Sequence, residues 1–179
     1  SLLRKPTRLG RLVAAVEKAV SIPVTVKLRT GWHEDKVNVR DVARACEEGG
    51  ADAIAIHGRT REQRYSKAAD WGLIGLVAAE RGVPVIGNGD ILTPYEASDR
   101  MRRSGVRSVM LGRGALIKPW LFREIKTGRS WLPSAEELYA NDPLRQERGD
   151  KAAHIRIEIG RPAYDADVGE LWLAFVLEP

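Results

Sequence analysis

Apolar and polar positions follow two rhythms along the chain, one typical of helices and one of buried strands. Over residues 8–20 apolar residues recur every three or four positions, which predicts a helix with one buried face. Residues 22–28 are a short run rich in β-branched residues, which predicts a buried strand. Similar helix and strand patterns follow along the chain. We predict strands at 22–28, 51–56, 83–86 and 106–111, and helices at 8–20, 37–48, 71–81, 94–104 and 120–126.

Residues that begin and end helices flank several of these segments. Asp70 precedes the helix at 71–81, where its carboxylate can accept a hydrogen bond from the first turn. Thr93 is a suitable cap for the helix at 94–104, and Pro94 suits the first helical position. The boundaries of these two helices are therefore predicted from two independent features, periodicity and capping.

Apolar strands that alternate with helices predict an α/β fold with a parallel sheet covered by helices. A doubly wound sheet and a (β/α)8 barrel share this rhythm. Polar and glycine-bearing segments follow every predicted strand, and function gathered at the carboxyl ends of the strands is typical of a barrel. A complete barrel needs about 250 residues, whereas this chain has four predicted strands in 179 residues. We predict half of a TIM barrel, with four β/α units.

The pattern changes after Trp120. Only residues 135–139 of the following segment have a convincing helical spacing, and residues 155–179 have no clear period. We therefore predict a half barrel at 1–126 and a divergent, partly helical tail at 127–179. The longest apolar run of the tail, Leu171–Leu177, is far shorter than the roughly 20 residues that span a membrane, so no membrane segment is expected.

Composition narrows the class of partner. Hydrophobic residues make up 44% of the chain and charged residues 30%, which suits a globular domain. The 29 Lys and Arg against 24 Asp and Glu give a net charge of +5, which favours a polyanionic partner such as RNA or a phosphate ligand. The single cysteine, Cys46, excludes an intramolecular disulfide and a cysteine-built metal site. We expect no metal, and a reducing compartment: the cytoplasm, with the nucleus as the alternative.

Glycine-bearing turns follow the third and fourth predicted strands. Asn88, Gly89 and Asp90 form the first, and Gly112 with Arg113 forms the second. Glycines let the backbone approach an anion closely, and a guanidinium suits a phosphate. Such barrels commonly bind phosphate after adjacent strands. The alternative is a pair of ordinary tight turns.

Two further residues end predicted strands at the same mouth. A barrel would aim Lys27 at the central ligand, where an anion or a polarised carbonyl would stabilise it. His57 ends the next strand and can donate a hydrogen bond to a phosphate or a ring oxygen. A solvent-facing lysine and a structural histidine are the alternatives. The convergence of both residues with the glycine turns favours one binding site.

A basic segment with one aromatic residue follows His57. Its cations can neutralise RNA phosphates, and Tyr65 can stack on a splayed base. A solvated surface loop is the alternative. The candidate RNA-binding residues are Arg59, Arg61, Arg64, Tyr65 and Lys67.

Four ordered motifs resemble the tRNA-dihydrouridine synthases: residues 24–31, 57–61, 87–91 and 112–116. The longer segments 57–71 and 118–122 are most similar to the eukaryotic branch that acts on uridine 47. The resemblance implies a TIM barrel that binds FMN, followed by a helical tRNA-binding domain. It also implies NADPH-linked reduction of the C5–C6 bond of a uridine in tRNA. The implied FMN-binding residues are Lys27, His57, Asn88, Gly89, Asp90, Gly112 and Arg113.

The chain also departs from this family. A catalytic cysteine in an Asn-x-Gly-Cys-Pro pattern supplies the proton to uracil, and the 179 residues contain no such pattern. Residues 1–6 resemble the segment that follows the pattern, so we expect the acid cysteine upstream of Ser1 and this chain to be the C-terminal half of the barrel, inactive alone. Cys46 lies on an apolar helix face and is expected in the core. Two alternatives stay open: a non-catalytic phosphate- or RNA-binding remnant, and a fragment whose exposed strand edges drive dimerisation or aggregation.

Overall fold

The computed structural model describes residues 2–134, which fold around one four-stranded parallel sheet. The strands lie side by side in chain order, and each pairs in parallel with the next. A doubly wound sheet reverses its strand order at a switch point, whereas this order contains no reversal, as in a barrel wall. The predicted α/β class with four parallel strands is confirmed. The strands are β1 (Thr25–Arg29), β2 (Ala53–His57), β3 (Val85–Asn88) and β4 (Ser108–Met110).

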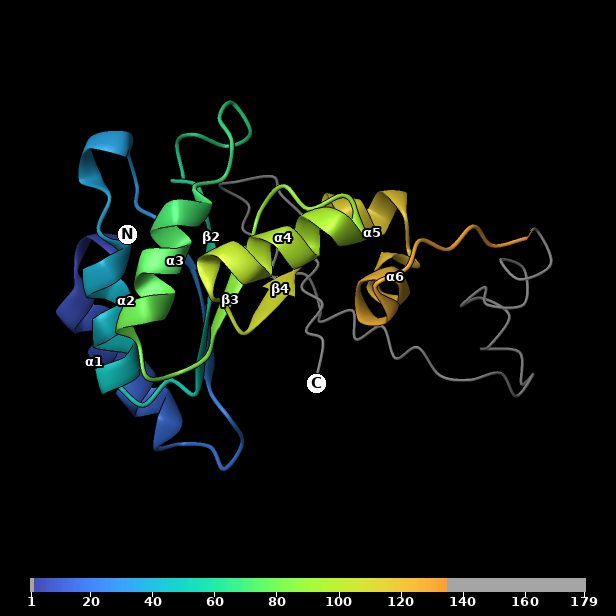
Figure 1. Ribbon diagram of the computed structural model, residues 1–179. Coiled ribbons are helices and arrows are strands. Elements are labelled where there is room, and N and C mark those ends of the chain that lie inside the picture. Colours follow the sequence, from blue (N-terminus) through green and yellow to red (C-terminus); the bar gives the residue numbers. More distant parts are fainter. Residues whose placement is uncertain (1, 135–179) are drawn as a thin grey trace.

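Helices α1 to α4 lie on one side of the sheet, and α5 and α6 follow the last strand (Figure 1). The α-helices are α1 (Pro6–Glu17), α2 (Val39–Glu48), α3 (Trp71–Glu80), α4 (Pro94–Ser104), α5 (Arg113–Ile117) and α6 (Leu121–Thr127), and the 3-10 turns are η1 (Leu2–Arg4) and η2 (Glu34–Lys36). Residues 135–179 lie outside the described part, so the predicted helix at 135–139 and most of the predicted tail are not described.

The caps predicted for α3 and α4 are present. The Asp70 carboxylate accepts a hydrogen bond of 2.8 Å from the Leu73 N–H. Thr93 accepts one of 3.1 Å from the Glu96 N–H, and the Glu96 carboxylate accepts one of 2.9 Å from the Thr93 N–H. This reciprocal capping box satisfies two donors at the start of α4. Both helices consequently begin where the sequence predicts.

Other boundaries differ from the prediction. Strands β2 and β3 run to His57 and Asn88, so these two residues belong to the sheet and not to the loops. The first helix ends at Glu17, and of its predicted apolar face only Leu9 and Val13 are buried. The prediction of a continuous buried apolar face was wrong, because α1 packs on α2 through a narrower face that contains Leu9, Gly10 and Val13; Leu12, Val16 and Val20 are exposed.

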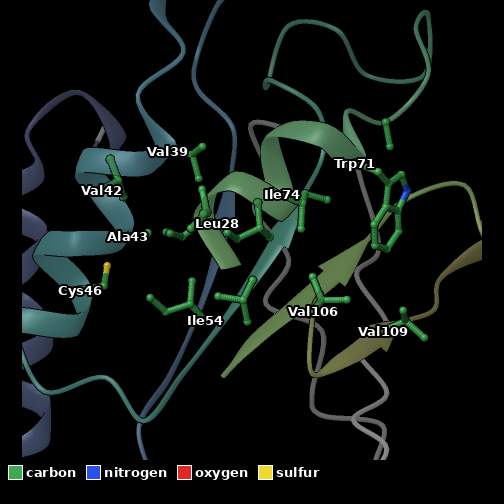
Figure 2. Close-up of a cluster of buried hydrophobic side chains, with 14 of the residues drawn as sticks. Leu28, Val39, Val42, Ala43, Cys46, Ile54, Trp71, Ile74, Val106 and Val109 are labelled. Atoms are coloured by element: carbon green, nitrogen blue, oxygen red, sulfur yellow. The ribbon is translucent and has the colours of Figure 1, made fainter. Parts of the chain in front are cut away.

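The core fills the space between the sheet and its helices (Figure 2). Ile54 and Ile56 of β2 point toward α2 and α3 and have no exposed surface. Cys46 of α2 is fully buried in the same cluster, as the sequence predicts. Burial of β-branched strand residues against α2 and α3 therefore holds the sheet and its helical layer together.

Strand register sorts the remaining strand residues onto the opposite face. Side chains alternate between the two faces of a strand. Because Ile54 and Ile56 face the helices, the residues on either side of them, and those aligned with these residues on the other strands, face away from α1 to α4. The register pairs Arg29 with His57, His57 with Asn88, and Asn88 with Met110. These four form one row across the carboxyl end of the sheet. Two residues earlier in each strand, on the same face, the register aligns a second row that contains Lys27, Ala55, Ile86 and Ser108.

Candidate functional site

A pocket of about 60 Å³ opens at the carboxyl ends of β3 and β4. It has room for several water molecules or one phosphate group. Residues from the ends of β2, β3 and β4, and from the loops that follow them, line it. They are His57, Arg59, Tyr65, Asn88, Gly89, Asp90, Ile91, Leu92, Met110, Leu111, Gly112, Arg113 and Gly114.

The last residue of β3 and the turn that follows it bring polar groups to this pocket. The Asn88 side-chain amide donates a hydrogen bond of 2.8 Å to the carbonyl oxygen of Met110 and so joins the ends of β3 and β4. Gly89 has φ +127°, and a Cβ there would lie 2.6 Å from the Cβ of Ala69. Glycine is therefore required both for the backbone conformation and for the close approach.

Asp90 is the centre of an ion network in the pocket wall. Its carboxylate accepts hydrogen bonds of 2.8 and 2.7 Å from the Arg59 guanidinium and one of 2.7 Å from the Ala69 N–H. The Arg113 guanidinium lies 3.4 Å from the same carboxylate. Burial would raise the pKa of Asp90, but the Ala69 N–H and the Arg59 guanidinium outweigh burial and lower this pKa. Asp90 is therefore a carboxylate at neutral pH.

The structure places Arg59 in this wall and not on an exposed basic loop. Arg59 is 3% exposed, and its Nε donates a hydrogen bond of 2.6 Å to the carbonyl oxygen of Lys67. Its charge is already opposed by Asp90. Of the five predicted RNA-binding residues, Arg59 is the one that the fold withdraws from the surface.

The turn after β4 combines an exposed guanidinium, that of Arg113, with open space beside Gly112. No atom lies within 4 Å of the Cβ position of Gly112, whereas a Cβ on Gly114 would lie 2.3 Å from the Ile91 carbonyl oxygen. The Arg113 guanidinium lies 4.3 Å from the centroid of the Tyr65 ring. Tyr65, predicted as an RNA contact, therefore covers a pocket cation.

His57 and Lys27 place a neutral donor and a cation on the face opposite the core. His57 is 4% exposed; burial, and then the charges of Lys27, Arg29 and Arg59, lower its pKa to about 3, so the ring is neutral at pH 7. Desolvation by surrounding protein, and then Arg29, lower the pKa of Lys27 to about 7, although its side chain keeps exposed surface. This face consequently favours an anion.

Arg29 is a site residue that the sequence reasoning did not select. It shares the row of His57 and Asn88, and it donates a hydrogen bond of 3.1 Å to the carbonyl oxygen of Thr60. Strand alternation from Lys27 could have identified it, because residues two apart in a strand share a face.

The remaining predicted RNA-binding residues lie outside the pocket. Arg64 is exposed and has φ 45°, and Arg61 lies over the ring of Trp32. Lys67 forms an ion pair of 2.6 Å with Glu34. The structure thus divides the predicted set into two pocket residues and three residues on the rim.

Residues 2–134 lack two further kinds of feature. Within this part, no group of three or more His, Cys, Asp or Glu side chains is arranged to hold a metal ion. None of its helices combines the length and the apolar character needed to cross a membrane.

Comparison with known proteins gives a consistent result. The family model for dihydrouridine synthase matches residues 1–143. A probable tRNA-dihydrouridine synthase from Rhizobium leguminosarum is 46% identical over 120 residues, which cover 67% of this chain and 38% of the relative. The tRNA-dihydrouridine(47) synthase [NAD(P)(+)] of Cryptococcus neoformans is 46% identical over 149 residues, which cover 76% of this chain and 21% of the relative. The human protein named tRNA-dihydrouridine(47) synthase [NAD(P)(+)]-like is 40% identical over 140 residues, which cover 77% of this chain and 21% of the relative.

The similarity includes the uridine 47 branch, as the motifs imply, and bacterial relatives match at equal identity. The chain spans less than half the length of these curated relatives. The family match, by contrast, extends over most of this chain. The chain belongs to the dihydrouridine synthase family.

Proposed function

We propose that this chain forms the part of an FMN-dependent tRNA-dihydrouridine synthase that holds the phosphate end of the flavin. The parent reaction is reduction of a uridine C5–C6 bond in tRNA, with NADPH as reductant. The relatives' names support the tRNA substrate and the oxidoreductase class. The observation that carries the proposal is the pocket that the two glycine turns and Arg113 line together.

The pocket fits a phosphate ester in shape and in charge. The open space at the Cβ position of Gly112 leaves the backbone accessible to a ligand. Arg113 and Gly114 begin α5, where the first N–H groups have no acceptor within the helix. Asp90 would repel a phosphate, but Arg59 engages both of its oxygens. Arg113, at 3.4 Å from Asp90, is consequently the cation that can turn to a ligand.

Bound FMN would supply hydride transfer between NADPH and the uracil ring. Toward such a group the residues of this chain bind and orient. Neutral His57 can donate one hydrogen bond and accept another, and Lys27 and Arg29 provide positive charge on the same face. Asn88, Gly89 and Asp90 would hold the ribityl chain, whose hydroxyl groups a carboxylate can accept from, and Gly112 with Arg113 would hold the phosphate.

Proton donation to uracil is not assigned to a residue of this chain. Its single cysteine, Cys46, is fully buried in α2, where burial raises the pKa of the thiol to about 11. A thiol in that position does not meet a nucleotide. We therefore expect these 179 residues to form no dihydrouridine when supplied with FMN, NADPH and unmodified tRNA, as measured by nucleoside mass spectrometry.

Flavin binding tests the proposal directly. FMN and riboflavin, which lacks the phosphate, are titrated against the chain and followed by flavin fluorescence. We expect Arg113→Ala to weaken FMN binding about tenfold, the effect of losing one charged hydrogen bond, and to leave riboflavin binding unchanged. Arg102→Ala is the matched control, because Arg102 lies on α4 and pairs with Asp99. Equal affinity of the two flavins for the unmodified chain would contradict the assignment.

The alternative is a binding remnant without chemistry. The position of Cys46 in the core favours it, since no other cysteine is present in the sequence. The synthase part and the binding remnant differ in one half-reaction, the reduction of bound flavin by NADPH. Anaerobic NADPH bleaches the flavin absorbance of a chain that keeps the reductive step, whereas a remnant binds FMN or tRNA and leaves the flavin oxidised.

A further inference from the structure

Two arginines from distant segments lie against one tryptophan at the rim of the site. Trp32 is half-buried in the loop between β1 and α2. The Arg4 guanidinium carbon lies 4.9 Å from its ring centroid, and that of Arg61 lies 4.4 Å away. Both distances are within the range of cation–π attraction. We define Arg4, Trp32 and Arg61 as the rim cluster.

Hydrogen bonds between two loops hold Arg61 in this position. The Arg61 N–H donates a bond of 3.0 Å to the Gly31 carbonyl oxygen, and the Glu62 N–H donates one of 3.1 Å to the Trp32 carbonyl oxygen. The His33 ring lies 2.8 Å from the Glu62 carboxylate and edge-on to Trp32. The rim cluster is thus part of an ordered surface and not of a freely moving basic loop.

The charges of the rim cluster are not balanced within the described part of the chain. Among residues 2–134, no carboxylate forms an ion pair with Arg4 or Arg61, whereas Arg40, for example, pairs with Glu80. Two like charges that share one ring repel each other, and an anion between or beside them would remove this repulsion. Planar guanidiniums held by an aromatic ring suit the oxygens of a phosphate group.

The position of the rim cluster limits the kind of anion. The glycine turns proposed to hold the flavin phosphate follow β3 and β4, which are two and three strands from β1; neighbouring strands are about 4.8 Å apart, so the end of β1 lies roughly 10 Å or more from these turns. A flavin phosphate in that pocket does not reach both places. A polymer of phosphates that approaches the same edge of the sheet does.

We propose that the rim cluster binds a backbone phosphate of the tRNA substrate. This inference rests on the proposed function, since it takes tRNA as the partner. It differs from the prediction made from sequence, which assigned RNA contact to the whole segment from Arg59 to Lys67. The rim cluster adds Arg4 and Trp32, which were not predicted, and shares only Arg61 with the predicted set. Arg59 and Tyr65 of that set line the pocket instead.

Salt-dependent tRNA binding by the purified chain tests the assignment. Unmodified tRNA is titrated by fluorescence anisotropy at several salt concentrations for the wild type, Arg4→Ala, Arg61→Ala and Trp32→Phe. Each arginine variant is expected to bind tRNA on the order of tenfold more weakly and to lower the salt slope by about 1. Trp32→Phe keeps a ring and both charges and is expected to bind within about twofold of the wild type, since the exposed cation–π contribution is small.

Two control variants separate the rim cluster from general positive charge. Arg64→Ala removes an exposed arginine from the same loop, and Arg107→Ala removes one beyond the amino end of β4. Both are expected to bind tRNA as the wild type does. A loss in either control equal to that of Arg61→Ala would overturn the assignment, because binding would then follow net charge.

Thermal unfolding and FMN titration of every variant separate this inference from the proposed function. Arg4→Ala and Arg61→Ala are expected to keep FMN affinity, since neither residue lines the pocket. If the wild type binds FMN and not tRNA, the rim inference fails and the flavin site stands. If tRNA binds through the rim cluster and FMN does not bind, the proposed flavin site fails instead. Arg61→Lys, which keeps the charge on a folded loop, is expected to restore part of the binding.

Discussion

Asp90 accepts two hydrogen bonds from the guanidinium of Arg59, at 2.8 and 2.7 Å, across two neighbouring loops of the sheet. Arg59 follows β2 and Asp90 follows β3, so the pair joins successive β/α units at their carboxyl ends. The same carboxylate also accepts a bond from the Ala69 N–H. One side chain therefore fixes the segment after β2 at two points.

Loss of this carboxylate charge is expected to destabilise the fold. In Asp90→Asn the amide fills the same space but leaves the buried Arg59 charge unopposed, and breaking such a pair costs about 3 kcal/mol. Urea unfolding followed by circular dichroism measures the free energy of unfolding. Asp99→Asn on α4 is the control, because its partners Arg102 and Arg103 are exposed and such pairs contribute less than about 1 kcal/mol. Equal losses in both variants would contradict a special role for Asp90.

Two glycines of one turn are expected to respond differently to alanine. Gly114→Ala places a methyl group 2.3 Å from the Ile91 carbonyl oxygen, so the turn must shift and the protein loses stability by about 1–3 kcal/mol. Gly112→Ala meets no atom within 4 Å and is expected to cost less stability while weakening FMN binding. Thermal unfolding and FMN titration measure the two effects. If Gly112→Ala keeps full FMN affinity, the open space there is not part of the flavin site.

Stability is expected to fall below pH 6.5 because of His57. The pKa of His57 is lowered from 6.5 to about 3 in the folded protein, so between pH 6.5 and pH 3 the unfolded chain binds more protons than the folded one. The free energy of unfolding therefore decreases as the pH falls through this window. The free energy of unfolding is compared at pH 6.5 and pH 5, a range above that in which most carboxylates titrate. His57→Gln is expected to reduce the loss of this free energy between the two pH values. His33→Gln, at the exposed rim, serves as the control; a loss unchanged by His57→Gln would exclude this cause.

Anion binding is expected to weaken above pH 7 because of Lys27. Its pKa of about 7 in the free protein means that the ammonium loses its proton as the pH rises from 7 to 9. A bound anion stabilises the ammonium, so FMN affinity falls across this range. Lys27→Met is expected to bind FMN more weakly at pH 7 and to show a flatter profile. A wild-type affinity that stays constant from pH 7 to pH 9 would remove Lys27 from the site.

Local patterns predicted the elements well where capping and periodicity agree. α4 begins and ends as predicted, because Thr93, Pro94 and Glu96 encode its start within four residues. The carboxyl ends of two strands were less well predicted. The apolar pattern stops before His57 and Asn88, although strand pairing includes both residues. Hydrogen bonding of the backbone does not require an apolar side chain, so the pairing of a strand can continue past the end of its apolar run.

Contacts between loops could not be read from local patterns. The burial of Arg59 depends on Asp90, 31 residues away, and the position of Arg61 depends on Trp32. Each pair is brought together by the parallel register of two strands. A segment rich in arginine has the same local pattern whether its side chains are buried against a carboxylate or exposed to solvent.

The row of Arg29, His57, Asn88 and Met110 has a consequence for folding itself. A slip of one residue in a strand would exchange its two faces and place a charged or amide side chain of this row beneath the helices. Such burial without partners costs several kcal/mol. The polar residues of this row therefore also penalise misaligned strand pairings, so the candidate site helps to keep the strands in register.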